Sequence, residues 1–217
     1  MTKVAYVGAD DEGLRNYYSI IPILKIKYKL LELKKIEGNL AFTSKRGIVS
    51  LKLNNVSLKP CKVYCIGNAT KDALKRYYGF ECKVPEKEDS LNLADLIIKE
   101  GIRRLTLVTS NQYSRDMLQK LVDNEIEVRI IEAYEIAKNE NIDPEEFSNY
   151  DALLFGSSKS FLFSVELIGL DKLKEKKIYA IGQPTARTIE THGLKPLKTF
   201  DSPDIRKSMD FIIDSLR

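Results

Sequence analysis

The sequence predicts an α/β fold of two similar domains, each built around a parallel sheet. The first observation is a repeat: Val63–Thr70 recurs about half a chain later as Ile178–Thr185, and each copy has the pattern of a buried strand that ends in a glycine turn before a helix. The second is the alternation of short β-branched segments with segments of helical periodicity, which is typical of parallel sheets covered by helices on both faces. A repeat this long indicates duplicated domains, since solenoid repeats span roughly 20–50 residues.

The repeat extends beyond these turns, because Leu40–Lys45 corresponds to Leu153–Ser158. The sequence therefore predicts two copies of a β-α-β-β-α-β-α-β-α unit, over residues 1–100 and 103–217. A helix is expected at Ser90–Lys99, where apolar residues share one face behind a serine N-cap. Buried strands are expected at four short apolar segments: Lys3–Gly8, Ile102–Thr109, Asp151–Phe155 and Lys177–Gly182.

Two longer segments alternate apolar with charged residues, and they occupy the same place in each copy. They are Ile21–Lys29 and Ile130–Lys138. The alternation predicts strands with one face exposed to water. Because the chain contains no Gly/Ser-rich linker, these two strands are expected to form a two-stranded connection between the domains.

Composition narrows the class of protein. The chain has 217 residues, of which 43% are hydrophobic and 30% charged, as in ordinary globular proteins. The net charge of +4 fits an anionic ligand but is too small to argue for nucleic acid. No apolar segment approaches the roughly 18 residues that a membrane span needs, and no signal-peptide core is present, so a cytoplasmic location is expected.

The cysteines and the histidine offer little chemistry. Cys61, Cys65 and Cys82 lack metal-ligand spacing, so we expect core or surface residues and no metal site. Cys61 and Cys65 are four apart in a predicted strand, which places both side chains on one face. His192 is expected at a helix end without a catalytic task.

The turns after the strands are the candidate binding elements. In parallel sheets, ligands bind outside the carboxyl ends of the strands, where helix N-termini offer free N–H groups to anions. Thr70 and Thr185 either cap the helices that follow or turn a hydroxyl to a ligand. The turns Thr43–Ser44 and Ser157–Ser158 are of the same kind. Helix capping alone would explain any one of them, but two matched pairs predict a shared anion-binding cleft.

Together these features resemble the uroporphyrinogen-III synthase family. The resemblance rests on Phe42–Ser44 and Phe155–Ser157, the doubled glycine turns, the strand around Tyr134 and the late Phe200–Pro203. It implies two α/β domains joined by a two-stranded β ladder, with a cleft between them. It also implies domains that interleave with the repeats: residues 1–24 with 138–217, residues 30–132, and linkers at 25–29 and 133–137.

The resemblance implies an enzyme, a lyase that needs no cofactor. It would cyclise the linear tetrapyrrole hydroxymethylbilane to uroporphyrinogen III, with inversion of ring D and loss of water. The substrate bears eight carboxylates, which suits helix N-termini and hydroxyl groups. Hydroxymethylbilane synthase would be a transient partner, and neither nucleic acid nor a membrane would be involved.

The resemblance also implies roles for individual residues. Tyr134 would assist departure of the hydroxyl as a hydrogen-bond donor, and the alternative for it is simple packing at the domain junction. Arg115 is expected one turn into its helix, and solvation at the surface is an equally good explanation for Lys45. Gly8–Asp11 receives no binding role, since its two acids would repel a polyanion. Substrate-binding roles fall on Thr43, Ser44, Lys45, Gly67, Asn68, Thr70, Arg115, Ser157, Ser158, Gly182, Gln183 and Thr185.

Two other classes of protein share this pattern. A non-catalytic two-domain binder of a small polyanionic ligand would have the same duplicated form. A regulatory α/β protein without activity would differ only in side chains that occlude the cleft.

Overall fold

The computed structural model describes residues 2–201 and 204–216. Ser202 and Pro203, which belong to the late motif of the resemblance, lie outside the described residues. The chain forms two compact units. We call Ile26–Ile136 the central unit, and Met1–Lys25 together with Ala137–Arg217 the terminal unit.

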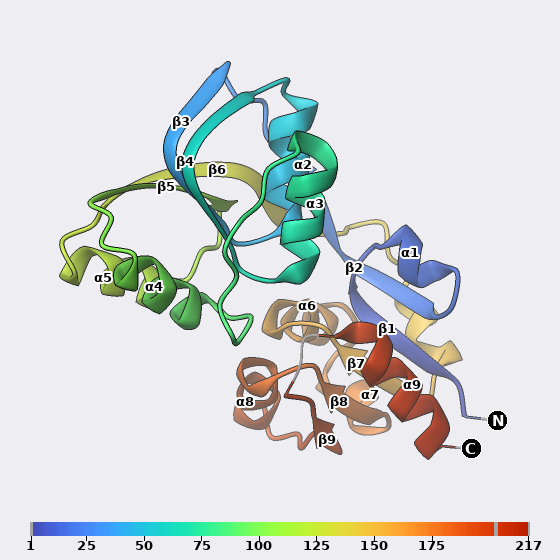
Figure 1. Ribbon diagram of the computed structural model, residues 1–217. Coiled ribbons are helices and arrows are strands. Elements are labelled where there is room, and N and C mark those ends of the chain that lie inside the picture. The colour runs from blue at the N-terminus through green and yellow to red at the C-terminus, as the bar shows by residue number, and fades with distance from the viewer. Residues whose placement is uncertain (1, 202–203, 217) are drawn as a thin grey trace. The chain divides into compact units, whose positions relative to one another are not determined.

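The central unit is a parallel sheet with two helices on each face (Figure 1). Its strands follow the order β4-β3-β5-β6. They are β3 (Lys35–Phe42), β4 (Ser57–Cys65), β5 (Arg104–Ser110) and β6 (Glu127–Lys138). The helices are α2 (Lys45–Leu53) and α3 (Asn68–Tyr78) on one face, and α4 (Ser90–Lys99) and α5 (Arg115–Asp123) on the other. Alternation along β3 directs Phe42 to the α2–α3 side and Ala41 to the α4–α5 side.

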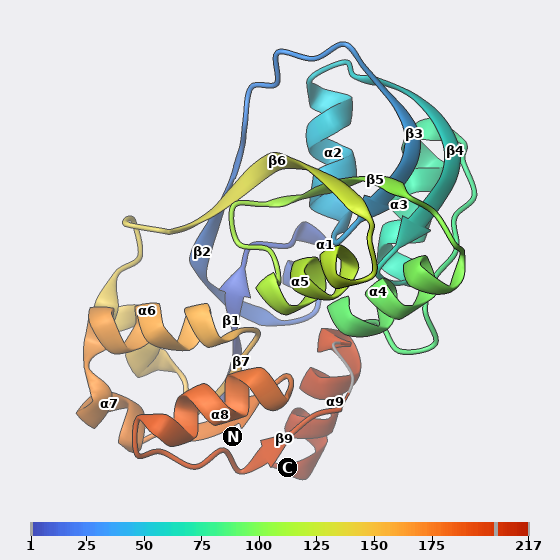
Figure 2. The ribbon, with the colours of Figure 1, turned by 90° about the vertical axis from the view of Figure 1, so that its left-hand side faces the viewer.

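The terminal unit has the same construction, with strands in the order β2-β1-β7-β8-β9 (Figure 1), and Figure 2 shows the same unit from another side. Its strands are β1 (Val4–Ala9), β2 (Ser19–Tyr28), β7 (Ala152–Phe155), β8 (Lys177–Ala180) and β9 (Lys198–Thr199). Its helices are α1 (Glu12–Arg15), α6 (Ser158–Ile168), α7 (Leu170–Lys174), α8 (Gln183–Thr191) and α9 (Ile205–Ser215), with a 3₁₀ helix at Pro144–Asn149. Leu14 and Met209 pack on the face that carries Leu154, whereas Phe161 of α6 packs edge-on against Phe155 on the other face.

These observations confirm the predicted α/β fold with parallel sheets. Strands occupy all four of the predicted buried segments, with small shifts at their ends. The two half-exposed segments are also strands, β2 and β6, which carry the chain from one unit to the other and are neighbours in the strand order. The exact domain limits expected from the sequence stay a prediction.

The two copies differ in detail from the predicted unit. Where the second copy has β9, the first has only an isolated bridge between Tyr64 and Lys83. The N-cap of α4 is Asp89 and not the expected Ser90, because the Asp89 carboxylate accepts a hydrogen bond from the N–H of Asn92. The prediction of a serine cap is therefore wrong, although the helix begins at Ser90.

The prediction that Cys61 and Cys65 share one face is also wrong. Cys61 is exposed and Cys65 is buried. The reason is an irregular register between β3 and β4, in which Gly38 pairs with Pro60 but Leu40 pairs with Val63. The extra residue on β4 shifts the alternation of its side chains, as a β-bulge does.

Candidate functional site

In the central unit, the carboxyl ends of neighbouring strands are tied together by backbone hydrogen bonds. The N–H of Ile66, after β4, donates to the carbonyl of Phe42 at the end of β3 (3.0 Å). The N–H of Asn111, after β5, donates to the carbonyl of Tyr134 on β6 (3.1 Å). The turns after β4, β3 and β5 therefore stand in a row at one edge of the sheet, where ligands of parallel sheets bind.

The turn after β3 uses both of its hydroxyl groups within the protein. The Ser44 hydroxyl caps α2 by accepting a hydrogen bond from the N–H of Arg46 (3.2 Å). The Thr43 hydroxyl donates to the hydroxyl of Thr109 on β5 (2.8 Å), a buried residue that sequence reasoning did not single out. Lys45, the first residue of α2, is exposed. The structure thus brings Thr43 and Ser44 beside the end of β5 and leaves the Lys45 cation at the surface.

The turn after β4 differs from its prediction. Gly67 is the N-cap of α3, and Thr70 is buried at the third position of the helix, so Thr70 does not cap it. A carboxylate instead lies at this helix opening. Oε1 of Glu88 accepts hydrogen bonds from the backbone N–H of Asn68 (3.0 Å) and from its side-chain amide (2.8 Å). Glu88 lies 20 residues away in the chain, and no local signal in the sequence pointed to it.

Tyr134 lies on β6 beside an irregularity in the pairing with β5, between Thr109 and Ser110. Such irregularities re-aim side chains at the edges of sites. Its side chain is only 4% exposed and packs in the core beneath α2 and α3. The buried Ser50 hydroxyl donates to the carbonyl of Ala133, which holds β6 directly before Tyr134.

A second tyrosine lies in the electrostatic surroundings of Tyr134. Partial burial raises the pKa of Tyr28, Arg46 opposes this shift, and Tyr134 adds to it. Tyr28 is 42% exposed, more than Tyr134. The end of β2 therefore adds a phenol to the surroundings of Tyr134, and the Arg46 guanidinium at the start of α2 acts on that phenol.

Arg115 is the first residue of α5, so the expectation that it lies one turn into the helix is wrong. Ser114 is the N-cap and accepts a hydrogen bond from the N–H of Met117 (3.2 Å). Arg115 is exposed at the opening of the helix that follows β5. Among the described residues, no hydrogen bond or ion pair joins its side chain to the other predicted site residues.

In the terminal unit, the turns after β7 and β8 lie side by side, because the N–H of Ile181 donates to the carbonyl of Phe155 (3.1 Å). Ser157 caps α6 in a reciprocal capping box with Ser160. The Ser158 hydroxyl donates to the carbonyl of Pro184 (3.1 Å) and accepts from the Thr188 hydroxyl (2.8 Å). Both serine hydroxyls are therefore engaged in local structure.

The opening of α8 is less covered. Gly182 is its N-cap, and the exposed Gln183 is its first residue. Thr185 is buried at the third position and, like Thr70, does not cap its helix. Within the described part of the chain, a Cβ atom at Gly182 would meet only Pro184 Cδ, at 3.8 Å. The structure thus brings Gly182, Gln183 and Ser158 to one edge of the terminal unit.

Tyr6 explains why the two copies differ at one turn residue. A Cβ atom at Gly156 would lie 2.2 Å from the Tyr6 hydroxyl oxygen. Gly156 occupies the place that Thr43 has in the first copy, so the ring of Tyr6 excludes a side chain there.

In the turn after β1, the Asp10 carboxylate pairs with Arg15 (2.5 Å), and Asp11 caps α1. Both carboxylates of that turn therefore interact with groups of the same turn and of α1.

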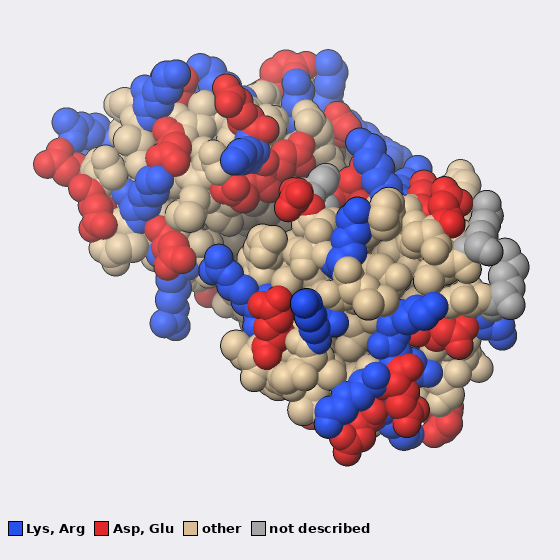
Figure 3. Space-filling model, turned by 90° about the horizontal axis from the view of Figure 1, so that it is seen from below, with Lys and Arg blue, Asp and Glu red and all other residues tan. Residues whose placement is uncertain are grey.

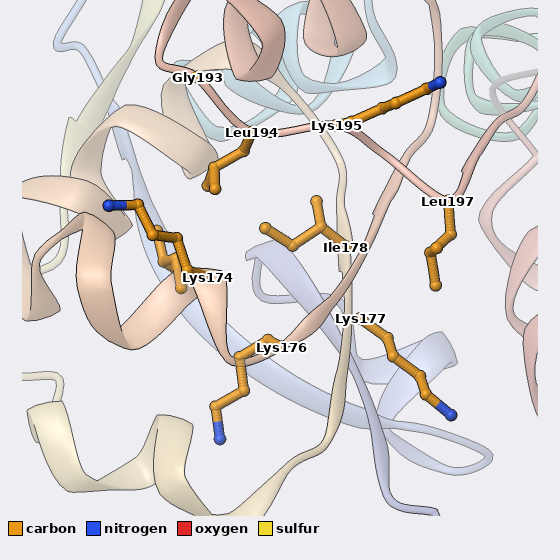
Figure 4. A pocket seen from close by; sticks show the side chains of 9 residues that line it. Lys174, Lys176, Lys177, Ile178, Gly193, Leu194, Lys195 and Leu197 are labelled. Carbon is orange, nitrogen blue, oxygen red and sulfur yellow. The ribbon is translucent and has the colours of Figure 1, made fainter.

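Two surface pockets lie at the starts of strands, opposite the carboxyl ends where the candidate turns lie. One, of about 260 Å³, is lined around Ile178 at the start of β8, and Figure 4 shows the ammonium groups of its four lysines pointing away from one another. Another, of about 380 Å³, lies around Ser57 at the start of β4. Neither pocket gathers charge at the strand ends where the candidate turns lie.

Positive and negative side chains alternate over the surface. Figure 3 shows Lys and Arg interspersed with Asp and Glu on the face that it presents. Among the described residues, no group of three or more His, Cys, Asp and Glu could hold a metal ion, and no helix is long and apolar enough to cross a membrane. His192 is the C-cap of α8, where its Nδ1 lies 2.8 Å from the carbonyl of Thr188.

Comparison with known proteins points to one family. The sequence pattern of the family described as uroporphyrinogen-III synthase HemD matches residues 19–207. A Methanocaldococcus jannaschii protein with the provisional name uroporphyrinogen-III synthase is 27% identical, over 82% of this chain and 80% of its own length. The fold matches uroporphyrinogen-III synthetase from Helicobacter pylori (TM-score 0.71, 18% identity, 100% of both chains). It also matches a mutant uroporphyrinogen III synthase from Thermus thermophilus (TM-score 0.61, 15% identity, 100% of this chain and 99% of that one).

Proposed function

The chain belongs to the uroporphyrinogen-III synthase HemD family, and from this premise we propose that it converts hydroxymethylbilane to uroporphyrinogen III. One observation carries the proposal: the family match spans residues 19–207, a range that contains every predicted site residue of both units. The activity would place the protein among the lyases of tetrapyrrole biosynthesis. The proposed enzyme acts without a cofactor and takes its substrate from hydroxymethylbilane synthase in the cytoplasm.

The proposed reaction makes and breaks bonds at the last pyrrole ring. The terminal hydroxyl of the bilane leaves as water, and the remaining carbon is an electrophilic azafulvene. That carbon is attacked by the substituted position of ring D, which gives a spiro intermediate that fragments and recloses with ring D inverted. Without enzyme, the same bilane closes to the symmetrical type I isomer. The protein therefore has to hold the chain so that the disfavoured attack occurs, which is catalysis by positioning.

The turns at the strand ends are proposed to bind carboxylates of the substrate. Helix openings at Gly67 and Gly182 present backbone N–H groups and the positive end of a helix dipole, and at Gly67 the N–H of Asn68 is bonded to Glu88. The hydroxyls of Ser44 and Ser157 already cap helices, so their proposed contribution is to shape the turns. Exposed cations at the helix openings, such as Arg115, would pair with the propionate and acetate groups of the substrate.

Tyr134 is proposed to donate a hydrogen bond to the departing hydroxyl. In support, β6 is fixed at Ala133 by the Ser50 hydroxyl and by the N–H of Lys29, and the pairing of β6 with β5 is irregular directly before Tyr134. Tyr28 would supply a second phenol close by, and Arg46 would supply positive charge beside Tyr28. A role in packing alone would instead follow from the low exposure of Tyr134.

The test is a coupled assay. Hydroxymethylbilane is supplied by its synthase, the products are oxidised, and the uroporphyrin isomers are separated by HPLC. Type III product well above the control without the protein would support the proposal. If the folded protein yields only type I product at the spontaneous rate, the proposed activity is wrong, and a non-catalytic binder of a polyanion becomes the better description.

The domain organisation is proposed in the same terms. Residues 1–24 with 138–217 would form one domain and residues 30–132 the other, with linkers at 25–29 and 133–137. The compact units at Met1–Lys25 with Ala137–Arg217, and at Ile26–Ile136, support this arrangement. A fragment of residues 26–136 that unfolds cooperatively by itself would establish an independent domain, and a fragment that stays unfolded would contradict it.

A further inference from the structure

Glu88 occupies the opening of α3 with its own carboxylate. One oxygen, Oε1, accepts hydrogen bonds from the backbone N–H of Asn68 at 3.0 Å and from the side-chain amide of Asn68 at 2.8 Å. The backbone N–H is one of the donors that a helix opening presents to an anion, and the side-chain amide adds a second donor. The contact links the segment before α4 to the turn after β4, and both lie in the central unit.

The adjacent glycine is matched to this carboxylate. Gly67 has extended backbone (φ −170°), which any residue adopts, so its conformation does not require glycine. With Glu88 in this position, however, a Cβ atom at Gly67 would lie 2.1 Å from Oε2 of Glu88 and 2.5 Å from its carboxyl carbon. The missing side chain makes room for the Glu88 carboxylate.

Among the described residues, no carboxylate is hydrogen-bonded at the repeated turn of the terminal unit. At Gly182, the nearest atom to an added Cβ is Pro184 Cδ, at 3.8 Å. The exposed Gln183 takes the place of Asn68 as the first residue of the helix. One of the two duplicated turns therefore holds a carboxylate of the protein itself, and the described part of the chain places none at the other.

We propose that Glu88 is an internal competitor, an autoinhibitory contact that a substrate carboxylate must displace before it can bind at Asn68. The inference rests on the proposed function, because it assigns the turn at Asn68 to substrate carboxylates. Displacement needs only that a surface side chain swings away, since Glu88 is exposed. The contact weakens the binding of substrate without taking part in the chemistry.

Kinetics test the competition. Glu88→Ala removes the internal carboxylate, and we expect KM for hydroxymethylbilane to fall roughly two- to tenfold with kcat unchanged. Glu86→Ala is the matched control, since it removes the same charge from an exposed residue of the same segment that has no ion pair among the described residues. A KM in Glu88→Ala equal to that of Glu86→Ala would overturn the proposal.

A second measurement does not need activity. Acetate is titrated into ¹⁵N-labelled protein, and the amide shifts of Asn68 and Gln183 are followed by NMR. In the unmodified protein we expect the Gln183 amide to respond and the Asn68 amide to stay unchanged, whereas in Glu88→Ala both should respond. An Asn68 amide that responds equally with and without Glu88 would contradict internal competition. If neither protein forms type III product, the proposed function fails and the substrate claim fails with it, while the titration still reports whether Glu88 blocks the turn.

Discussion

The buried hydroxyl of Ser50 donates a 2.5 Å hydrogen bond to the carbonyl of Ala133, the residue directly before Tyr134. The same carbonyl accepts the backbone N–H of Lys29 at 3.1 Å. A residue of α2 and the residue directly after β2 thus both bind β6 at this carbonyl. This arrangement fixes the backbone from which the proposed hydrogen-bond donor projects.

Ser50→Ala should therefore lower both stability and activity. Loss of one buried hydrogen bond costs about 1 kcal/mol of unfolding free energy, and a less firmly held β6 should lower the rate of type III formation. Denaturant unfolding and the coupled assay measure the two effects. Ser164→Ala is the control, since the Ser164 hydroxyl is also buried and donates to a backbone carbonyl, that of Ser160, but within α6. Equal activity of the two variants would show that Ser50 has no positioning role.

Tyr134→Phe should lower kcat by roughly tenfold or more while the fold stays intact, because general acid assistance contributes about 10²–10⁴-fold where it operates. The rate of type III formation at saturating substrate measures it. Tyr78→Phe serves as a control, since it removes another phenol hydroxyl of the central unit, one that donates to the carbonyl of Val56 at 2.9 Å. Unchanged kcat in Tyr134→Phe would leave Tyr134 as a packing residue.

Tyr64→Phe should leave stability unchanged or raise it by up to about 1 kcal/mol. The Tyr64 hydroxyl is buried and has no hydrogen-bond partner among the described residues, and burial raises its pKa to about 12. Tyr78→Phe should instead lose about 1 kcal/mol, because its hydroxyl does have an acceptor. Urea unfolding of the two variants compares them directly, and a large loss of stability in Tyr64→Phe would mean that its hydroxyl has a partner.

Glu100→Gln should remove a stabilisation that depends on pH. The pKa of Glu100 lies below its ordinary value of 4.5, because Lys83 first and then Lys62 donate hydrogen bonds to its carboxylate. The folded state therefore binds this proton less tightly than the unfolded state. The stabilisation is complete above about pH 4.5 and is lost as the pH falls through the folded-state pKa. The difference in Tm between the two proteins should be present at pH 7 and shrink toward pH 3, and a difference independent of pH would contradict the ion-pair origin.

Much of the fold could be predicted from local patterns. The repeated strand–glycine–helix segments placed the turns at Gly67 and Gly182, and the alternation of apolar and charged residues predicted β2 and β6 as half-exposed strands. Helix caps were less accessible, because a cap depends on which neighbouring side chain reaches a free N–H. Asp89 therefore caps α4 where Ser90 was expected, and Thr70 lies inside α3 without capping it.

The sequence by itself determined the duplicated βα units, their parallel sheets and the positions of the turns, because β-branched runs, helical periodicity and glycine turns are local properties of the chain. Only the tertiary structure decided what fills each turn. Glu88 reaches Asn68 from 20 residues away, and Ser50 reaches Ala133 from 83 residues away. The ring of Tyr6 fills the space beside Gly156. Such contacts depend on how distant side chains meet when the sheets and helices pack, and no local pattern in the chain encodes that meeting.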